Sequence, residues 1–176
     1  MFSMFKRYHQ DARLTIYYAA MIATHANLAE IRPNEILLAL TWREHASDCA
    51  FRKLKDDFQQ VWSAAEYTHF PLSNVPYKPR TKPALPLGQS AKRVLYCARQ
   101  EADRSNDYWI DIDHIMRGLL SEDGPSAAIL KSTGWTIENV TSKAEEGRKR
   151  YPSTPVSLLN RLGWRYMVWL RRMGWH

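Results

Sequence analysis

The sequence predicts an all-α protein made of two similar four-helix lobes, joined by a proline-rich linker and followed by a C-terminal amphipathic helix. Three observations predict this fold class. Apolar residues recur with helical spacing in two long stretches, no segment shows the sustained alternation of a strand, and the two stretches match at an offset of 79 residues. A chain of 176 residues has room for one compact domain or for two small lobes that share a boundary.

The internal repeat is clearest in the first helix of each half. Its shared apolar positions are Ala12, Ile16, Ala19 and Ala23 in the first half and Ala91, Leu95, Ala98 and Ala102 in the second. Their spacing of four, three and four residues forms one stripe of a helix, and small alanines let another helix approach closely. Chance similarity between two unrelated amphipathic helices is the alternative. The following connection and second helix also keep the register, so we expect a true but eroded duplication.

Helix ends can be placed from capping residues. Asn27 and Asn106 follow the two alanine stripes, and asparagine readily adopts the left-handed conformation that ends a helix. Pro33 suits the first turn of the next helix, while Asp111 and Asp113 can cap its counterpart or complement its dipole. The expected helices span about 11–26, 34–44, 47–55 and 57–66 in the first half, and about 90–105, 112–121, 125–133 and 137–149 in the second.

Prolines divide the chain. Five of the nine prolines fall within "FPLSNVPYKPRTKPALPL", residues 70–87, where neither a helix nor a central strand can continue. We therefore expect a first repeat over about 10–67, a linker over 68–87 and a second repeat over about 88–150. Residues 1–150 would form one double-repeat domain, and residues 151–176 a separate tail.

The positive charge lies toward the C-terminal end of the chain. The formal net charge is +7, of which +6 comes from residue 143 onward, so residues 1–142 carry only +1. On a helix, "VSLLNRLGWRYMVWLRRMGWH" would place aromatic and apolar side chains on one side and arginines on another. Such a helix can pack on the body, insert into a groove of a partner, or adsorb to an anionic membrane. Its candidate docking residues are Trp164, Arg165, Trp169 and Arg172.

Signatures of enzymes and cofactors are lacking. The sequence has no G-x-x-x-x-G-K-[ST] phosphate loop, no G-x-S-x-G elbow, no H-E-x-x-H and no Gly-rich dinucleotide turn, so we expect a non-enzyme that binds neither ATP nor another cofactor. His45 and Cys49 lie one helical turn apart, but without a second pair we expect no metal site. Two cysteines, no secretory signal and no apolar run of membrane-spanning length predict a cytoplasmic protein.

The second half resembles the Clp N-terminal repeat, also called the Clp R domain. The matching letters are "SAKRVLYCARQEA", "WIDIDHIMRGLL", "SEDG" and "SAAILKSTGW". The likeness covers about residues 88–147 well and 10–66 weakly. It implies that Ile115, Leu119, Leu120, Ile129 and Leu130 are core residues, that Gly118 is a point of close helix contact, and that Gly124 and Pro125 start the third helix.

The resemblance also points to candidate binding residues. The family typically begins its second helix with Gly-Thr-Glu-His, and in some members that Glu helps to hold phosphorylated arginine on substrates. Asp113 keeps an acid at this place in the second repeat, but Asn34 stands there in the first. We therefore take Asp113 and Asn34 as candidate peptide- or adaptor-binding residues without expecting phosphoarginine recognition. Capping and dipole compensation are the alternative role for Asp113.

The resemblance implies a protein-binding module without its motor. It would be a stand-alone accessory factor of Clp-type proteolysis, and its partner would be a Clp ATPase or protease component, an adaptor or a substrate peptide. The seam between the repeats is the expected surface, because neither half fills it alone. The alternative is a protein that acts at a membrane surface or on nucleic acid through its basic tail, and nucleic acid is the less expected target because the body is nearly neutral.

Overall fold

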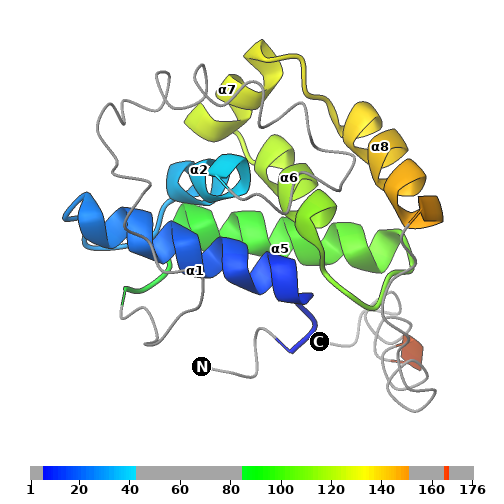
Figure 1. Cartoon of the computed structure of the whole chain (residues 1–176), viewed down its shortest axis with the longest axis horizontal. Coiled ribbons are helices and arrows are strands. Elements are labelled where there is room, and N and C mark those ends of the chain that lie inside the picture. The colour runs from blue at the N-terminus through cyan, green and yellow to red at the C-terminus, as the bar shows by residue number, and fades with distance from the viewer. Residues whose placement is uncertain (1–5, 43–84, 151–164, 167–176) are drawn as a thin grey trace.

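The computed structural model describes residues 6–42, 85–150 and 165–166 of the chain. Six helices lie in this part of the protein (Figure 1): α1 Gln10–His25, α2 Pro33–Trp42, α5 Gln89–Arg104, α6 Ile112–Ser121, α7 Pro125–Ser132 and α8 Ile137–Arg150. The predicted helices over 47–55 and 57–66, the linker up to residue 84 and most of the tail lie outside the described residues. All six observed helices begin and end within two residues of their predicted bounds.

The all-α fold class is confirmed for the described ranges. They contain no strand, and their only extended pairings are two isolated bridges. In the first repeat α1 packs against α2, and in the second α5 packs against α6, which also contacts α7 and α8. The repeats meet where α2 contacts α5, α6 and α7 and where α1 contacts α6. Neither 16-residue helix, α1 or α5, nor any shorter one described here combines the length and hydropathy of a membrane span.

The core includes the residues that the periodic pattern predicted. All eight positions of the two matched stripes are buried, with exposed fractions between 0% and 8%. The five family core positions on α6 and α7 are buried as well. Gly118 allows close approach of α5 and α6, since a Cβ atom there would lie 2.4 Å from the Val94 carbonyl oxygen. Gly124 and Pro125 start α7 as expected.

The first helix of each repeat ends in the same backbone conformation and with equivalent hydrogen bonds. Asn27 has a φ of 53° and Asn106 a φ of 57°, which confirms the predicted left-handed ends. Just after each asparagine, the amide of Leu28 donates to Ala23 O over 2.9 Å, and that of Asp107 donates to Ala102 O over 2.8 Å. These are the same hydrogen bonds displaced by 79 residues. The backbone therefore carries the duplication more clearly than the side chains do.

Each repeat is also tied to the other by its backbone. Tyr8, before α1, forms a parallel bridge with Ile110, before α6, and Leu87, before α5, forms one with Ile31, before α2. These bridges are again equivalent under the same offset. The Ile110 amide donates to Arg7 O over 2.7 Å, and the Ile31 amide donates to Pro86 O over 2.8 Å. The start of each second helix is thus fixed by the residues that lead into the first helix of the other repeat.

Candidate functional site

The candidate site comprises the first turns of α2 and α6, where the sequence places Asn34 and Asp113. Ile31 and Ile110 immediately precede these turns and make the crossed bridges, so both helix starts have fixed positions. A helix start presents amide groups without partners inside the helix, and polar side chains must satisfy them. The side chains that satisfy these amides determine which polar groups at the helix start remain available to a binding partner.

In the second repeat the first turn of α6 is closed by a capping box. The Asp111 carboxylate accepts a hydrogen bond from the Ile112 amide over 2.8 Å, and the imidazole of His114 accepts one at Nδ1 from the Asp111 amide over 3.1 Å. His114 is only 1% exposed. The predicted capping role of Asp111 is therefore confirmed, and Asp113 lies in the first turn, where an acid complements the helix dipole.

In the first repeat Glu35 takes the place of His114. Its Oε2 accepts from the Arg32 amide over 2.7 Å, the counterpart of the bond from the Asp111 amide. Its Oε1 accepts from the Arg32 guanidinium over 2.9 Å. The Glu35 side chain is fully buried while that of Arg32 is 45% exposed, so the arginine neutralises the carboxylate from the solvent side. Pro33 begins α2, as predicted.

Asp113 belongs to a buried charged cluster centred on Arg117. The Arg117 guanidinium donates to Asp113 Oδ2 over 2.8 Å, to Ser105 Oγ over 3.0 Å and to Glu101 Oε2 over 3.4 Å. The Arg117 and Asp113 side chains are 4% and 5% exposed. Arg104 pairs with the other oxygen of Glu101. Because buried charges are stable only when paired, this cluster fixes α6 on α5.

His114 is surrounded by acids. Its Nε2 lies 3.2 Å from Asp107 Oδ2, and its Nδ1 lies 3.2 Å from Asp113 Oδ1. Burial alone would lower the pKa of His114, but the hydrogen bonds to Asp107 and Asp113 outweigh it and raise that pKa above its usual value, against a smaller opposing effect of the Arg117 charge. The imidazole is therefore poised to carry a proton inside the fold.

Asn34 does not meet Asp113 but contacts the other repeat. Its Oδ1 accepts a hydrogen bond from the Ser126 hydroxyl over 2.6 Å. Ser126 lies in the first turn of α7 and is 2% exposed, while Asn34 is half-buried. The first turn of α2 is thereby attached directly to α7. Across the described residues no group of three or more His, Cys, Asp and Glu side chains is arranged to hold a metal ion.

Comparison with known families covers both repeats. The model of the Clp repeat (R) N-terminal domain matches residues 7–133 and, in a second overlapping match, residues 87–157. The chain belongs to the Clp repeat (R) N-terminal domain family. This assignment confirms the resemblance of the second repeat and the weaker resemblance of the first.

Solved structures show the same fold. A structure described under preliminary structural investigations of a malarial protein secretion system has a TM-score of 0.63 at 19% identity, covering 82% of this chain and 97% of that one. The N-terminal domain of the caseinolytic protease associated chaperone ClpD from Arabidopsis thaliana gives 0.56 at 20% identity, covering 81% and 97%. The Hsp104 N-terminal domain from Candida albicans gives 0.58 at 19% identity, covering 81% and 92%.

Placed in the Clp repeat fold, the two candidate residues have different surroundings. Asp113 stands where the family has glutamate, but both of its carboxylate oxygens face partners, Arg117 and His114. Asn34 is the more accessible of the two and is uncharged. Neither Asn34 nor Asp113 therefore offers a free carboxylate to a cationic ligand.

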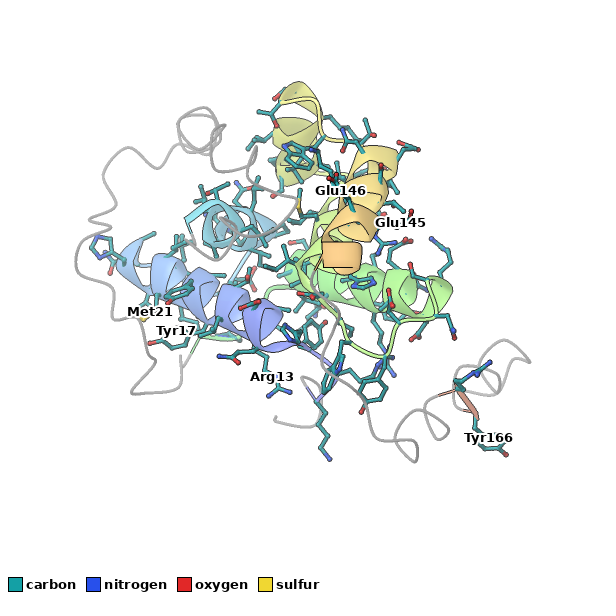
Figure 2. All side chains as sticks on the ribbon, turned by 45° about the vertical axis from the view of Figure 1, so that its right-hand side comes forward. Arg13, Tyr17, Met21, Glu145, Glu146 and Tyr166 are labelled. Atoms are coloured by element: carbon teal, nitrogen blue, oxygen red, sulfur yellow. The ribbon has the colours of Figure 1, made fainter. Side chains whose placement is uncertain are left out.

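The described part of the tail consists of Arg165 and Tyr166. Both are helical and exposed, and the Tyr166 side chain is 60% exposed. Figure 2 shows Tyr166 away from the helices of the double repeat. The other predicted docking residues of this Clp repeat protein, Trp164, Trp169 and Arg172, lie outside the described residues, as do His45 and Cys49.

Sequence reasoning missed Arg117 and Glu35. Arg117 lies four residues after Asp113, and this spacing places opposite charges on one helix face. The signal was present, but charges on a helix usually face solvent and would not suggest a buried pair. Glu35 follows Arg32 by three residues, yet arginine is not a residue that marks the start of a capping box, so the bond to the Arg32 amide had no sequence signature.

Proposed function

We propose that this chain is a protein-binding module that docks a peptide, an adaptor or a component of a Clp-type ATPase or protease, as an accessory factor of proteolysis. The observation that carries this proposal is the family match over both repeats, 7–133. Clp repeat domains act as substrate- and adaptor-binding modules, and binding needs no catalytic group. Residues 1–150 form the binding domain in this proposal, and residues 151–176 are a separate tail.

The proposed docking surface is the side of the double repeat that carries the first turns of α2 and α6. Asn34 would contact the partner directly, because it is half-buried and its amide group has hydrogen-bonding capacity beyond the bond from Ser126. Asp113 would act through the fold, by holding Arg117 and the start of α6 in place. A partner recognised through backbone and amide contacts suits this surface better than one recognised by its positive charge.

Affinity capture from an extract of the source cells, followed by mass spectrometry, tests this function. The full-length chain should enrich subunits of a Clp ATPase or protease. Asn34→Arg places a long charged side chain in the proposed surface and should reduce that enrichment at least about tenfold, the loss expected from a poorly tolerated interface residue. The matched control Glu145→Gln on α8, which lies away from α2 (Figure 2), should not.

Two outcomes would contradict the proposal at different levels. Recovery of no Clp subunit by the wild-type chain would contradict the function itself. Equal recovery by the wild type and Asn34→Arg would leave the function standing but exclude this surface. Circular dichroism of each variant would verify that the helices are intact.

A second candidate function rests on the composition of the tail and on the exposure of Tyr166 within it. We propose that residues 151–176 dock on an anionic membrane surface through Trp164, Arg165, Trp169 and Arg172, independently of the body. Support comes from the exposed position of Tyr166 and from the four arginines of residues 151–176, which contain no acidic residue. Amphipathic segments rich in arginine and aromatic residues bind interfaces in this way.

Deletion of residues 156–176 separates the two functions. Under the first proposal the shortened chain should still capture its partner. Under the second, binding to vesicles that contain phosphatidylserine should be lost with the deletion and, in the full chain, should fall steeply as salt is raised. Vesicle binding that survives the deletion would contradict the tail proposal.

A further inference from the structure

A single ring nitrogen of His114 faces two partners that need opposite protonation states. Nδ1 lies 3.1 Å from the Asp111 amide nitrogen and 3.2 Å from Asp113 Oδ1. The amide can only donate a hydrogen bond, so it requires a lone pair on Nδ1. The carboxylate can only accept one, so it requires a proton there. Both contacts cannot be hydrogen bonds at the same time.

The other ring nitrogen fixes the neutral tautomer. Nε2 lies 3.2 Å from Asp107 Oδ2, which also accepts. In the neutral ring the proton therefore sits on Nε2 and bonds to Asp107, and Nδ1 is free to accept from the Asp111 amide. Adding one proton to Nδ1 gives an imidazolium that donates to Asp107 and Asp113 together. The Asp111 amide then loses the acceptor that closes the first turn of α6.

We propose that His114 is a proton-operated switch at the start of α6, in which protonation moves the Nδ1 hydrogen bond from the Asp111 amide to the Asp113 carboxylate. The cap is closed when the ring is neutral and opens when it is charged. Asp113 is then held by two cations, Arg117 on Oδ2 and His114 on Oδ1. The inference is independent of the proposed partner.

The first repeat contains the matching site without a switch. Glu35 occupies the position of His114 and caps the Arg32 amide, the counterpart of the Asp111 amide. A carboxyl group can accept this bond whether or not it carries a proton, because it has two oxygens, whereas Nδ1 loses its only lone pair when it is protonated. The molecule therefore carries its own control, since the Arg32 cap should not respond to a pH change that opens the Asp111 cap.

The charged groups on the surrounding elements support this assignment. From the segment before α6, Asp107 and Asp111 face the ring, and from α6 itself Asp113 and Arg117 do.

Charged groups on the other packed elements have different nearest partners. On α5, Glu101 contacts Arg117; before α1, Arg7 bonds to Asp107 O and His9 faces Asp111 Oδ1 at 3.9 Å. On α8, Lys143 lies over the Trp135 ring, on α2 Glu35 pairs with Arg32, and on α7 Lys131 is exposed.

Nuclear magnetic resonance of the full-length wild-type chain tests the switch without a variant. Between about pH 8 and 5, the ¹⁵N shifts of His114 should change from a ring protonated only at Nε2 to one protonated at both nitrogens. Over the same titration, exchange of the Asp111 amide, corrected for its intrinsic rate, should become about fivefold faster relative to the Arg32 amide. A neutral ring protonated at Nδ1, or a constant ratio of the two amides, would overturn the proposal.

Two variants separate His114 from its neighbour. His114→Gln cannot titrate and should abolish the pH dependence of the amide ratio. His9→Gln removes the other imidazole near Asp111 and should leave that dependence intact. If the dependence survives in His114→Gln or disappears in His9→Gln, the switch belongs to another group, and the wild-type ¹⁵N data decide the question if either variant fails to fold.

Discussion

At the residue scale, Arg117 is the centre of a buried charged cluster in the second repeat. It is 4% exposed and contacts both Asp113 of its own helix and Glu101 of α5. Burying one arginine between two carboxylates removes three charges from water, and only their mutual pairing offsets that cost. The contribution of the cluster is therefore best seen by removing one member and leaving the others buried.

Arg117→Met should lower the free energy of unfolding by about 3–5 kcal/mol, because methionine fills the space but removes the cation that Asp113 and Glu101 share inside the fold. The matched control is Arg93→Met, whose guanidinium pairs with Glu122 at the surface and is 61% exposed. An exposed pair of this kind contributes no more than about 1 kcal/mol. Urea denaturation followed by circular dichroism measures both variants. Similar losses of unfolding free energy in the two variants would show that the buried cluster stabilises the fold no more than a surface ion pair does.

His114 makes the stability of the second repeat depend on pH. Hydrogen bonds to Asp107 and Asp113 raise its pKa above that of an unfolded histidine, about 6.5, despite burial. A raised pKa means that the folded state binds the proton more tightly. The stabilisation is therefore complete below about pH 6.5 and is lost as the pH rises through the folded-state pKa.

The expected result is a stability difference between wild type and His114→Gln that shrinks as the pH rises, measured by urea denaturation at a series of pH values. Asp107→Asn removes an acid that raises this pKa, so it should weaken the dependence in an otherwise wild-type chain. A wild-type advantage that grows toward alkaline pH would show that burial, not hydrogen bonding, dominates the titration.

At the element scale, the helices were predictable and their polar packing was not. Alanine stripes, the asparagine ends and Pro33 or Pro125 at helix starts are local signals, and local signals decide where a helix begins and ends. The contact of Arg117 with Glu101 joins two helices, and a sequence gives no sign of which exposed-looking charge a neighbouring helix will cover. The sequence correctly placed Asp113 at the helix start, but only the structure shows which side chains it contacts.

The sequence also did not predict that equivalent positions of the two repeats differ in burial. Tyr17 and Tyr96 occupy the same position in α1 and α5, yet Tyr17 is 8% exposed and Tyr96 61%. Identical letters in a repeat therefore predict the same helix face without predicting the same neighbours. Figure 2 shows Tyr17 between Arg13 and Met21 along α1, a face whose counterpart on α5 is open at Tyr96.

Gly118 sets how closely α5 and α6 approach. A Cβ atom there would lie 2.4 Å from Val94 O and 2.9 Å from the Ala98 nitrogen, and backbone atoms cannot turn aside as a side chain can. Gly118→Ala should therefore lower the free energy of unfolding by about 1–2 kcal/mol, since overpacking costs about 1–3 kcal/mol and the helix propensity of alanine returns less than about 1.

The control for Gly118 is Gly124→Ala. No atom lies within 4 Å of a Cβ at Gly124, and its φ of 179° is open to any residue, so the change should stay within about 0.5 kcal/mol. Thermal unfolding of both variants makes the comparison. If Gly118→Ala were as stable as wild type, the two helices would have to separate at no cost, which the packing of α5 on α6 does not suggest.

At the scale of the whole molecule, the two repeats are one structure rather than two lobes on a string. Each second helix starts from a bridge to the other repeat, Ile31 with Leu87 and Ile110 with Tyr8. The sequence predicted the repeats and a seam between them but not this crossing, since a bridge of one residue pair has no periodic pattern. The crossing predicts that both repeats unfold in a single transition, because neither can complete its second helix start alone.

The hydrogen bond between Asn34 and Ser126 joins the two repeats, so its contribution to stability can be measured directly. Ser126 donates to Asn34 Oδ1 over 2.6 Å and is 2% exposed, so each alanine variant leaves a polar partner without its bond. In a double-mutant cycle, Asn34→Ala and Ser126→Ala should couple by about 1 kcal/mol, since the second change costs little once the first has removed the bond. Urea denaturation of the four proteins gives the coupling.

Asn139 provides the matched comparison, because its amide caps the start of α8 and bonds to Gly134 O within the second repeat. Asn139→Ala combined with Asn34→Ala should be additive to within about 0.5 kcal/mol, as expected for residues that share no partner. Coupling of Asn34 to Ser126 but not to Asn139 would show that the contact between α2 and α7 contributes to the free energy that holds the two repeats together. Equal and negligible coupling in both cycles would mean that the repeats are held together by the crossed bridges and apolar contacts alone.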